Sequence, residues 1–141
     1  MKILEINVLR GPNYWSCFRT HLIEMKLDLN FYEHFPTNKI DGFTDRLMAL
    51  IPSLYTHRCS EGREGGFLYR MQEGTWLGHV VEHVALELQS LAGMNCGFGR
   101  TRSTHKAGVY SVVFTDQIEN AGIYTAKAAV ALVTALAEGR S

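Results

Sequence analysis

The 141-residue chain carries fourteen Lys and Arg residues against fourteen Asp and Glu residues, so its formal net charge is zero. This charge balance argues against a nucleic-acid partner or an anionic membrane surface. The content of 46% hydrophobic and 11% aromatic residues predicts one folded domain, residues 1–141. Three irregularly spaced cysteines indicate reduced thiols, and no signal segment or long apolar run is evident, so we expect a cytoplasmic, soluble protein.

Two strands and a helix are predicted in the first part of the chain. Residues 2–9 and 21–29 alternate apolar and polar side chains, and the intervening Arg-Gly-Pro-Asn break at 10–13 favours an antiparallel pair. Apolar residues at helical spacing predict a helix over 43–54, which Pro52 is expected to end or kink.

The second part is predicted to hold a short strand, a helix, further strands and a long terminal helix. The helix starts after Thr75 as N-cap and stops at Gly93, and the segment 97–102 that follows is too irregular for a helix. The other expected elements are a strand over 67–71, a strand over 109–115 and a helix over 117–138.

The expected order is β-β-α-(β)-α-β-β-α, which lacks the repeated βαβ rhythm of a parallel sheet. We therefore predict an α+β fold, a two-layer sandwich of antiparallel strand pairs with helices packed on one face.

The segment 78–83, Gly-His-Val-Val-Glu-His, contains an H-x-x-E-H signature within the helix after Thr75. At 100° per residue His79 and His83 lie about 40° apart, and all three functional side chains project within an arc of about 100°. Two imidazoles on neighbouring turns can bind one zinc ion, and Glu82 is placed to act as general base. A structural role for these histidines is the alternative, but an apolar stripe beside them favours a pocket wall.

A zinc centre of this type needs a third protein ligand. We favour Glu119, at the start of the last helix, with Glu87 as the runner-up or as a residue that supports the ligands. Four further side chains are weaker alternatives: His57, Cys59, Cys96 and His105.

Several blocks of the sequence resemble the N-terminal domain of cyanophycin synthetase, in the same order and nearly from end to end. They are LRGPNYWS, MKLDL, PSL, CS-x-G-x-x-GGFL-x-R, GH-x-x-EHVALELQ-x-LAGM, GFGRTR, and GVYSVVF followed by Glu119 and AGIYTAKAAV. In that family the domain precedes an ATP-grasp module and a Mur-ligase-like module, which build a poly-aspartate backbone bearing arginine. Neither module is present in this sequence, so no ligase activity is expected from it.

The resemblance implies a zinc-dependent hydrolase that cuts cyanophycin internally and yields short chains able to prime polymerisation. The matching positions are His79, His83 and Glu119 as zinc ligands and Glu82 as the base. Arg100 is predicted to stabilise the reaction intermediate, with Arg102 and His105 as alternatives.

The polymer carries carboxylate and guanidinium groups, so its groove should contain both charges. The arginines predicted to contact substrate carboxylates are Arg63, Arg70, Arg100 and Arg102, and the acidic residues predicted to meet guanidinium groups are Glu61, Glu64 and Glu73.

Two other functions stay open. The domain is alternatively a non-catalytic module that binds cyanophycin for the synthetase, in which case Glu82 has no role. It is otherwise an assembly element, in which Tyr14, Trp15 and Trp76 form a subunit contact. The expected partners are accordingly cyanophycin, other modules of the synthetase, or a second copy of the chain.

Overall fold

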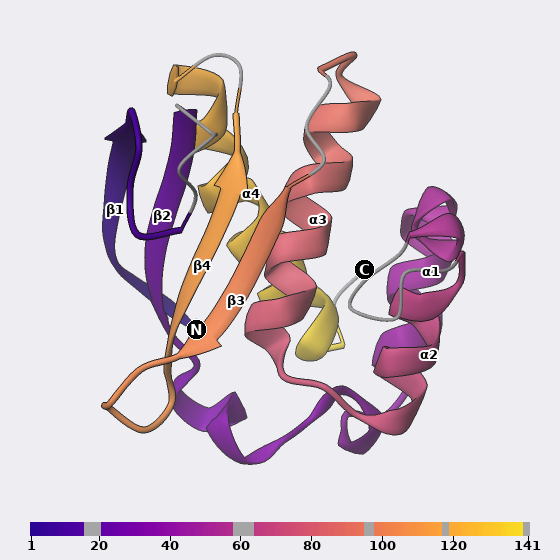
Figure 1. Ribbon diagram of the computed structural model, residues 1–141. Helices are drawn as coiled ribbons and strands as arrows, with labels where there is room; N and C mark the ends of the chain where they lie inside the picture. The colour runs from indigo at the N-terminus through magenta and orange to yellow at the C-terminus, as the bar shows by residue number, and fades with distance from the viewer. Residues whose placement is uncertain (16–20, 58–63, 95–97, 117–118, 140–141) are drawn as a thin grey trace.

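Four antiparallel strands form one sheet in the order β1-β2-β4-β3 in the computed structural model of this chain (Figure 1). The structure describes residues 1–15, 21–57, 64–94, 98–116 and 119–139. The strands are β1 (Lys2–Arg10), β2 (His21–Asp28), β3 (Gly99–Ser103) and β4 (Val109–Thr115). β1 and β2 pair directly, as predicted, with an irregularity in register between Ile3 and Glu5.

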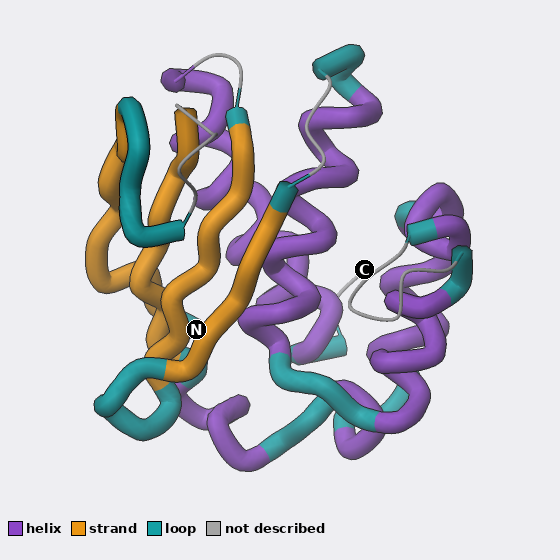
Figure 2. The backbone as a smooth tube through the Cα atoms, in the orientation of Figure 1, coloured by secondary structure: helices purple, strands orange, loops and turns teal. Residues whose placement is uncertain are grey.

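Two long helices cover one face of this sheet, as Figure 2 shows. Helix α3 (Leu77–Leu91) packs against β3 and β4, and α4 (Glu119–Ala137) packs against β1, β2 and α3. The alternation of the strands points Ile23, Met25 and Val112 towards these helices, where they are fully buried. The predicted α+β class and the helices on one face of the sheet are therefore confirmed.

Helix α4 is apolar over most of its length because it belongs to the core. By length and composition alone, its segment Asn120–Ala137 would be able to cross a membrane, and 44% of that segment is buried inside the fold. Ala126, Ala129 and Val133 are fully buried, and such small side chains allow α4 to lie close to its neighbours.

Two short helices, α1 (Phe43–Leu50) and α2 (Gly66–Glu73), lie to the right of α3 in Figure 1, and the 3-10 helices η2 (Thr37–Lys39) and η3 (Pro52–Thr56) pack against both. A further 3-10 helix, η1 (Asn30–His34), follows β2 near Gly108 in the turn between β3 and β4. Pro52 ends the first predicted helix, as expected, and opens η3. The predicted strand over 67–71 is wrong, because this segment belongs to α2. Phe67 and Met71 are one helical turn apart and both fully buried, which a helix explains and an alternating strand does not.

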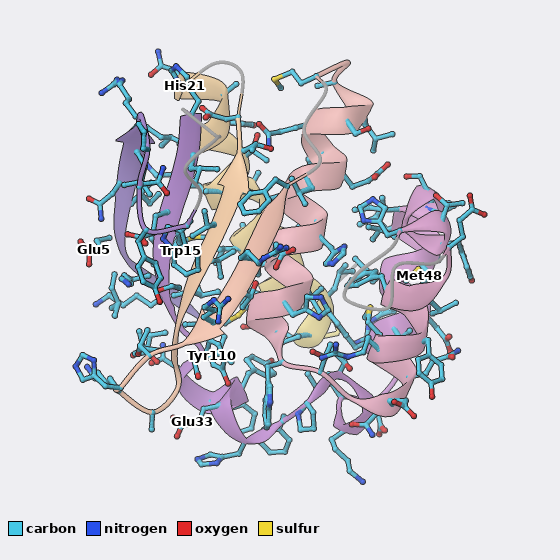
Figure 3. The ribbon with its side chains drawn as sticks, viewed as in Figure 1. Glu5, Trp15, His21, Glu33, Met48 and Tyr110 are labelled. Atoms are coloured by element: carbon cyan, nitrogen blue, oxygen red, sulfur yellow. The ribbon has the colours of Figure 1, made fainter. Side chains whose placement is uncertain are left out.

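The other face of the sheet carries polar side chains and part of the N-terminal loop. Trp15 donates a hydrogen bond from Nε1 to Oε2 of Glu24 at 2.6 Å, and Lys26 donates to the Ser111 hydroxyl at 2.5 Å. In Figure 3 Trp15 lies over the sheet, far from Met48 in α1. These contacts are remote from α3, the helix with the H-x-x-E-H motif, because α3 packs on the opposite face of the sheet.

Candidate metal centre

Helix α3 lies close to the sheet because Gly78 has no side chain. A Cβ atom at this position would lie 3.3 Å from Cγ2 of Thr101 and 3.4 Å from Cβ of Tyr110. The predicted N-cap, Thr75, is not the cap: Trp76 takes that position without a side-chain hydrogen bond. Thr75 is instead held by hydrogen bonds to Thr37, which leaves its hydroxyl 3.1 Å from Nδ1 of His79.

The structure brings His79, Glu82 and His83 together on neighbouring turns of α3, as the motif predicts. The two imidazole centroids are 4.7 Å apart, and Nε2 of His83 lies 3.8 Å from Oε2 of Glu82. Glu82 and His83 are buried, with 7% and 4% exposure. Three polar groups thus converge in a largely buried site.

Burial raises the pKa of Glu82 from 4.5 to about 7, although a hydrogen bond from Thr101 and the charge of Arg100 both act to lower it. The Thr101 hydroxyl donates to Oε1 of Glu82 at 2.7 Å. Gly99 leaves room for the carboxylate, since a Cβ atom there would lie 2.7 Å from Oε2. A buried carboxyl with this pKa can exchange a proton near neutral pH.

Burial also keeps both histidines of the motif neutral. The pKa of His79 falls to about 4 through desolvation and the charge of Arg70. The pKa of His83 falls well below its usual value through desolvation first, then through the nearby His79, His57 and Arg70. Neutral imidazoles are the form that binds metal ions.

Three neighbours of the centre were underrated or missed in the sequence. Phe67 from α2 stacks on His83, with ring centroids 4.1 Å apart and planes inclined by 18°. His57, treated as a weak ligand, places Nδ1 3.0 Å from Nδ1 of His83, and its Nε2 hydrogen-bonds to Oε2 of Glu87. Thr101 was not identified as a site residue from the sequence. Its position between Arg100 and Arg102 in one short strand was the signal that it lies on the opposite face from them.

The predicted arginines surround the centre unevenly. β3 is a strand, so Arg100 and Arg102 leave the sheet on the side opposite Thr101. Arg100 nevertheless donates to the Gly99 carbonyl at 3.0 Å, and its charge affects the pKa of Glu82. Arg70, half-buried on α2, acts on both histidines, whereas Arg63 lies outside the described residues.

Glu119, the predicted third ligand, is the first residue of α4. α4 begins just beyond Thr115, whose carbonyl accepts a hydrogen bond from Gln89 of α3 at 3.0 Å. At about 1.5 Å per residue, His83 lies about 9 Å and His79 about 15 Å along α3 from that level. The Glu119 side chain is outside the described part of the chain, so its role as a ligand stays a prediction.

The two imidazoles themselves fit a zinc ion. Each has its Nδ1 atom in contact with a neighbour, Thr75 for His79 and His57 for His83, which leaves both Nε2 atoms for a metal. Within the described ranges, no group of three or more His, Cys, Asp or Glu side chains is arranged to hold a metal ion. The described residues thus bring together two neutral imidazoles and one buried carboxyl.

Fold and site together define an α+β domain with a buried histidine–glutamate centre on a helix packed against its sheet. The sequence profile of the cyanophycin synthase-like N-terminal domain matches residues 23–138. The chain belongs to this family.

Its relatives include the cyanophycin synthetases of Geminocystis herdmanii, Synechocystis sp. and Nostoc sp., each 54% identical to this chain. The matches cover 96%, 98% and 98% of the chain. They cover only 16%, 16% and 15% of those synthetases, so the chain corresponds to about one sixth of each relative.

Proposed function

We propose that this domain is a zinc-dependent hydrolase that cleaves the backbone of cyanophycin and yields short chains that prime polymer synthesis. The observation that supports it best is the buried Glu82, whose pKa is raised to about 7 beside two neutral imidazoles. A carboxyl kept only to support the fold gains nothing from such desolvation. The synthetase relatives indicate the polymer that is the substrate of this proposal.

His79 and His83 would hold the zinc ion through their Nε2 atoms. When bound there, zinc would supply Lewis acidity, which lowers the pKa of water towards neutrality. No step in the proposal depends on the identity of the third ligand.

Glu82 carries the proton transfers. Its Oε1 atom is held by the Thr101 hydroxyl, so Oε2 is the oxygen available to take a proton from the attacking water. With a pKa of about 7, Glu82 can then give that proton to the amide nitrogen that leaves as the bond breaks. The same carboxyl thus serves as base and then as acid.

Arg70 and Arg100, whose charges act on the pKa values of the centre, suit a substrate rich in carboxylates. In this proposal Arg100, at the Gly99 carbonyl, stabilises negative charge that develops on the substrate oxygen. Arg70 binds a carboxylate of a neighbouring unit of the polymer, whereas Arg102, on the opposite face of the sheet, and Arg63, outside the described residues, stay predictions of the sequence. Other modules of a full-length synthetase would extend the chains that are released.

The test is to incubate the purified protein with cyanophycin and to follow polymer length and soluble product. Parallel reactions contain a zinc chelator, the Glu82→Gln variant, and a Glu5→Gln control on the distant strand β1. The proposal expects cleavage by the wild type and by Glu5→Gln, and none with chelator or Glu82→Gln.

Intact polymer in every reaction contradicts the hydrolase. If the polymer then still sediments with the protein, the domain is a binding module of the synthetase instead.

A further inference from the structure

A chain of hydrogen-bonded groups leads from Glu87 through His57 to His83. The Oε2 atom of Glu87 meets Nε2 of His57, and Nδ1 of His57 lies 3.0 Å from Nδ1 of His83. Glu87 and His57 expose only 10% and 17% of their side chains. We infer that His57 and Glu87 are positioning residues that fix which ring nitrogen of His83 carries its proton.

The direction of these hydrogen bonds follows from the carboxylate of Glu87, at one end of this series of groups. An ionised carboxylate can only accept hydrogen bonds, so Nε2 of His57 donates to Glu87. In its neutral form His57 has this one N–H group, so its Nδ1 accepts from Nδ1 of His83. The lone pair of His83 is thereby left on Nε2, the atom 3.8 Å from Oε2 of Glu82.

Among the described residues, His79 contacts a group of a different kind. Its Nδ1 atom faces the Thr75 hydroxyl at 3.1 Å, and a hydroxyl group both donates and accepts. Thr75 therefore orients the His79 ring without choosing its tautomer. The two histidines of the motif differ in this respect, although the motif itself treats them alike.

Part of this inference rests on the proposed zinc site. A ligand whose tautomer is already correct binds without proton rearrangement, and partners of this kind are typically worth ten- to a hundredfold in metal affinity. We call the series Glu87, His57 and His83 the relay. We expect its loss to weaken zinc binding by about that factor. The tautomer of His83 itself is a property of the metal-free protein and is tested separately.

The first measurement is the long-range nitrogen–proton NMR spectrum of the metal-free protein, in which protonated and unprotonated ring nitrogens are distinguished. His83 is assigned by comparison with a His83→Gln variant. The inference expects the proton of His83 on Nδ1. In Glu87→Gln, which keeps size and shape, the amide can donate to His57, so a His83 form with its proton on Nε2 should appear.

The second measurement is zinc affinity, by competition with a chromophoric chelator. In His57→Asn the side-chain oxygen can still accept from His83, whereas His57→Leu fills similar space without an acceptor. The relay expects His57→Asn to bind zinc within a few-fold of the wild type and His57→Leu to lose about ten- to a hundredfold. A His34→Asn variant, at a side chain that is 78% exposed, is the control.

A proton on Nε2 of His83 in the wild type overturns the inference. So does equal or tighter zinc binding by His57→Leu than by His57→Asn, because a purely packing role favours the apolar residue. If the wild type binds no zinc at all, the proposed function fails, while the NMR result still decides the relay. If His57→Leu does not fold, Glu87→Gln supplies the affinity comparison.

Discussion

Replacing Glu82 by Gln should stabilise the metal-free protein while it abolishes cleavage. The folded state binds a proton on Glu82 more tightly than the unfolded chain does, because burial raises the pKa from 4.5 to about 7. The free energy of unfolding of the wild type therefore falls as the pH rises from about 4.5 to about 7, and this contribution is constant above that range.

A rise in pKa of this size corresponds to about 3 kcal/mol at pH 8 and to less than about 1 kcal/mol at pH 5. Gln carries no charge at either pH and can still accept the hydrogen bond from Thr101, so Glu82→Gln avoids this destabilisation. The variant should therefore exceed the wild type by about 3 kcal/mol at pH 8.

Urea unfolding followed by circular dichroism at pH 5 and pH 8 measures the difference directly. A chelator must be present, since zinc bound to the folded state would add stability of its own. Glu5→Gln, an exposed carboxyl on β1, serves as control and should show no such pH-dependent gain. If Glu82→Gln gains the same stability at both pH values, or none, Glu82 is not desolvated as the structure indicates.

Three further changes test the surroundings of the base. Thr101→Val removes the hydroxyl that lowers the pKa of Glu82. The acidic limb of the rate–pH profile for polymer cleavage should therefore move up by about one pH unit, and an unmoved limb contradicts this. Gly99→Ala places a Cβ atom 2.7 Å from Oε2 of Glu82, so initial cleavage rates should fall at least about tenfold, with unchanged circular dichroism; full activity would exclude the contact. Phe67→Ala removes the ring stacked on His83 and should cost about 3 kcal/mol in urea unfolding, whereas a loss below about 1 kcal/mol would show that the site collapses around it.

Local patterns in the sequence predicted those parts of the protein that depend on neighbouring residues. The spacing of His79, Glu82 and His83 fixes their common side of a helix whatever packs against it. The alternation in β1 and β2 and the break between them likewise predicted an antiparallel pair. The strand predicted at 67–71 was wrong, and the four-residue spacing of Phe67 and Met71 is the local pattern that indicates a helix there.

The remainder of the site depends on contacts between distant segments. His57 and Thr101 meet α3 only because η3 and β3 pack on opposite sides of it, and no local pattern specifies that arrangement. Thr75 shows the same limit, because its bonds to Thr37 override its preference for capping a helix. Motif spacing thus predicts ligands more readily than the residues that orient them.

The order of the strands has a consequence for how the chain folds. β2 is completed early in the sequence, yet its second partner, β4, comes after all of α3, so the central pairing closes a long loop. Until then the hairpin of β1 and β2 exposes the apolar side chains of Ile23, Met25 and Leu27, which are fully buried in the end. Such non-local pairing slows folding, and one edge of β2 stays unpaired until β4 is in place. During folding this hairpin is therefore a segment with an open strand edge and an apolar face that other chains can meet.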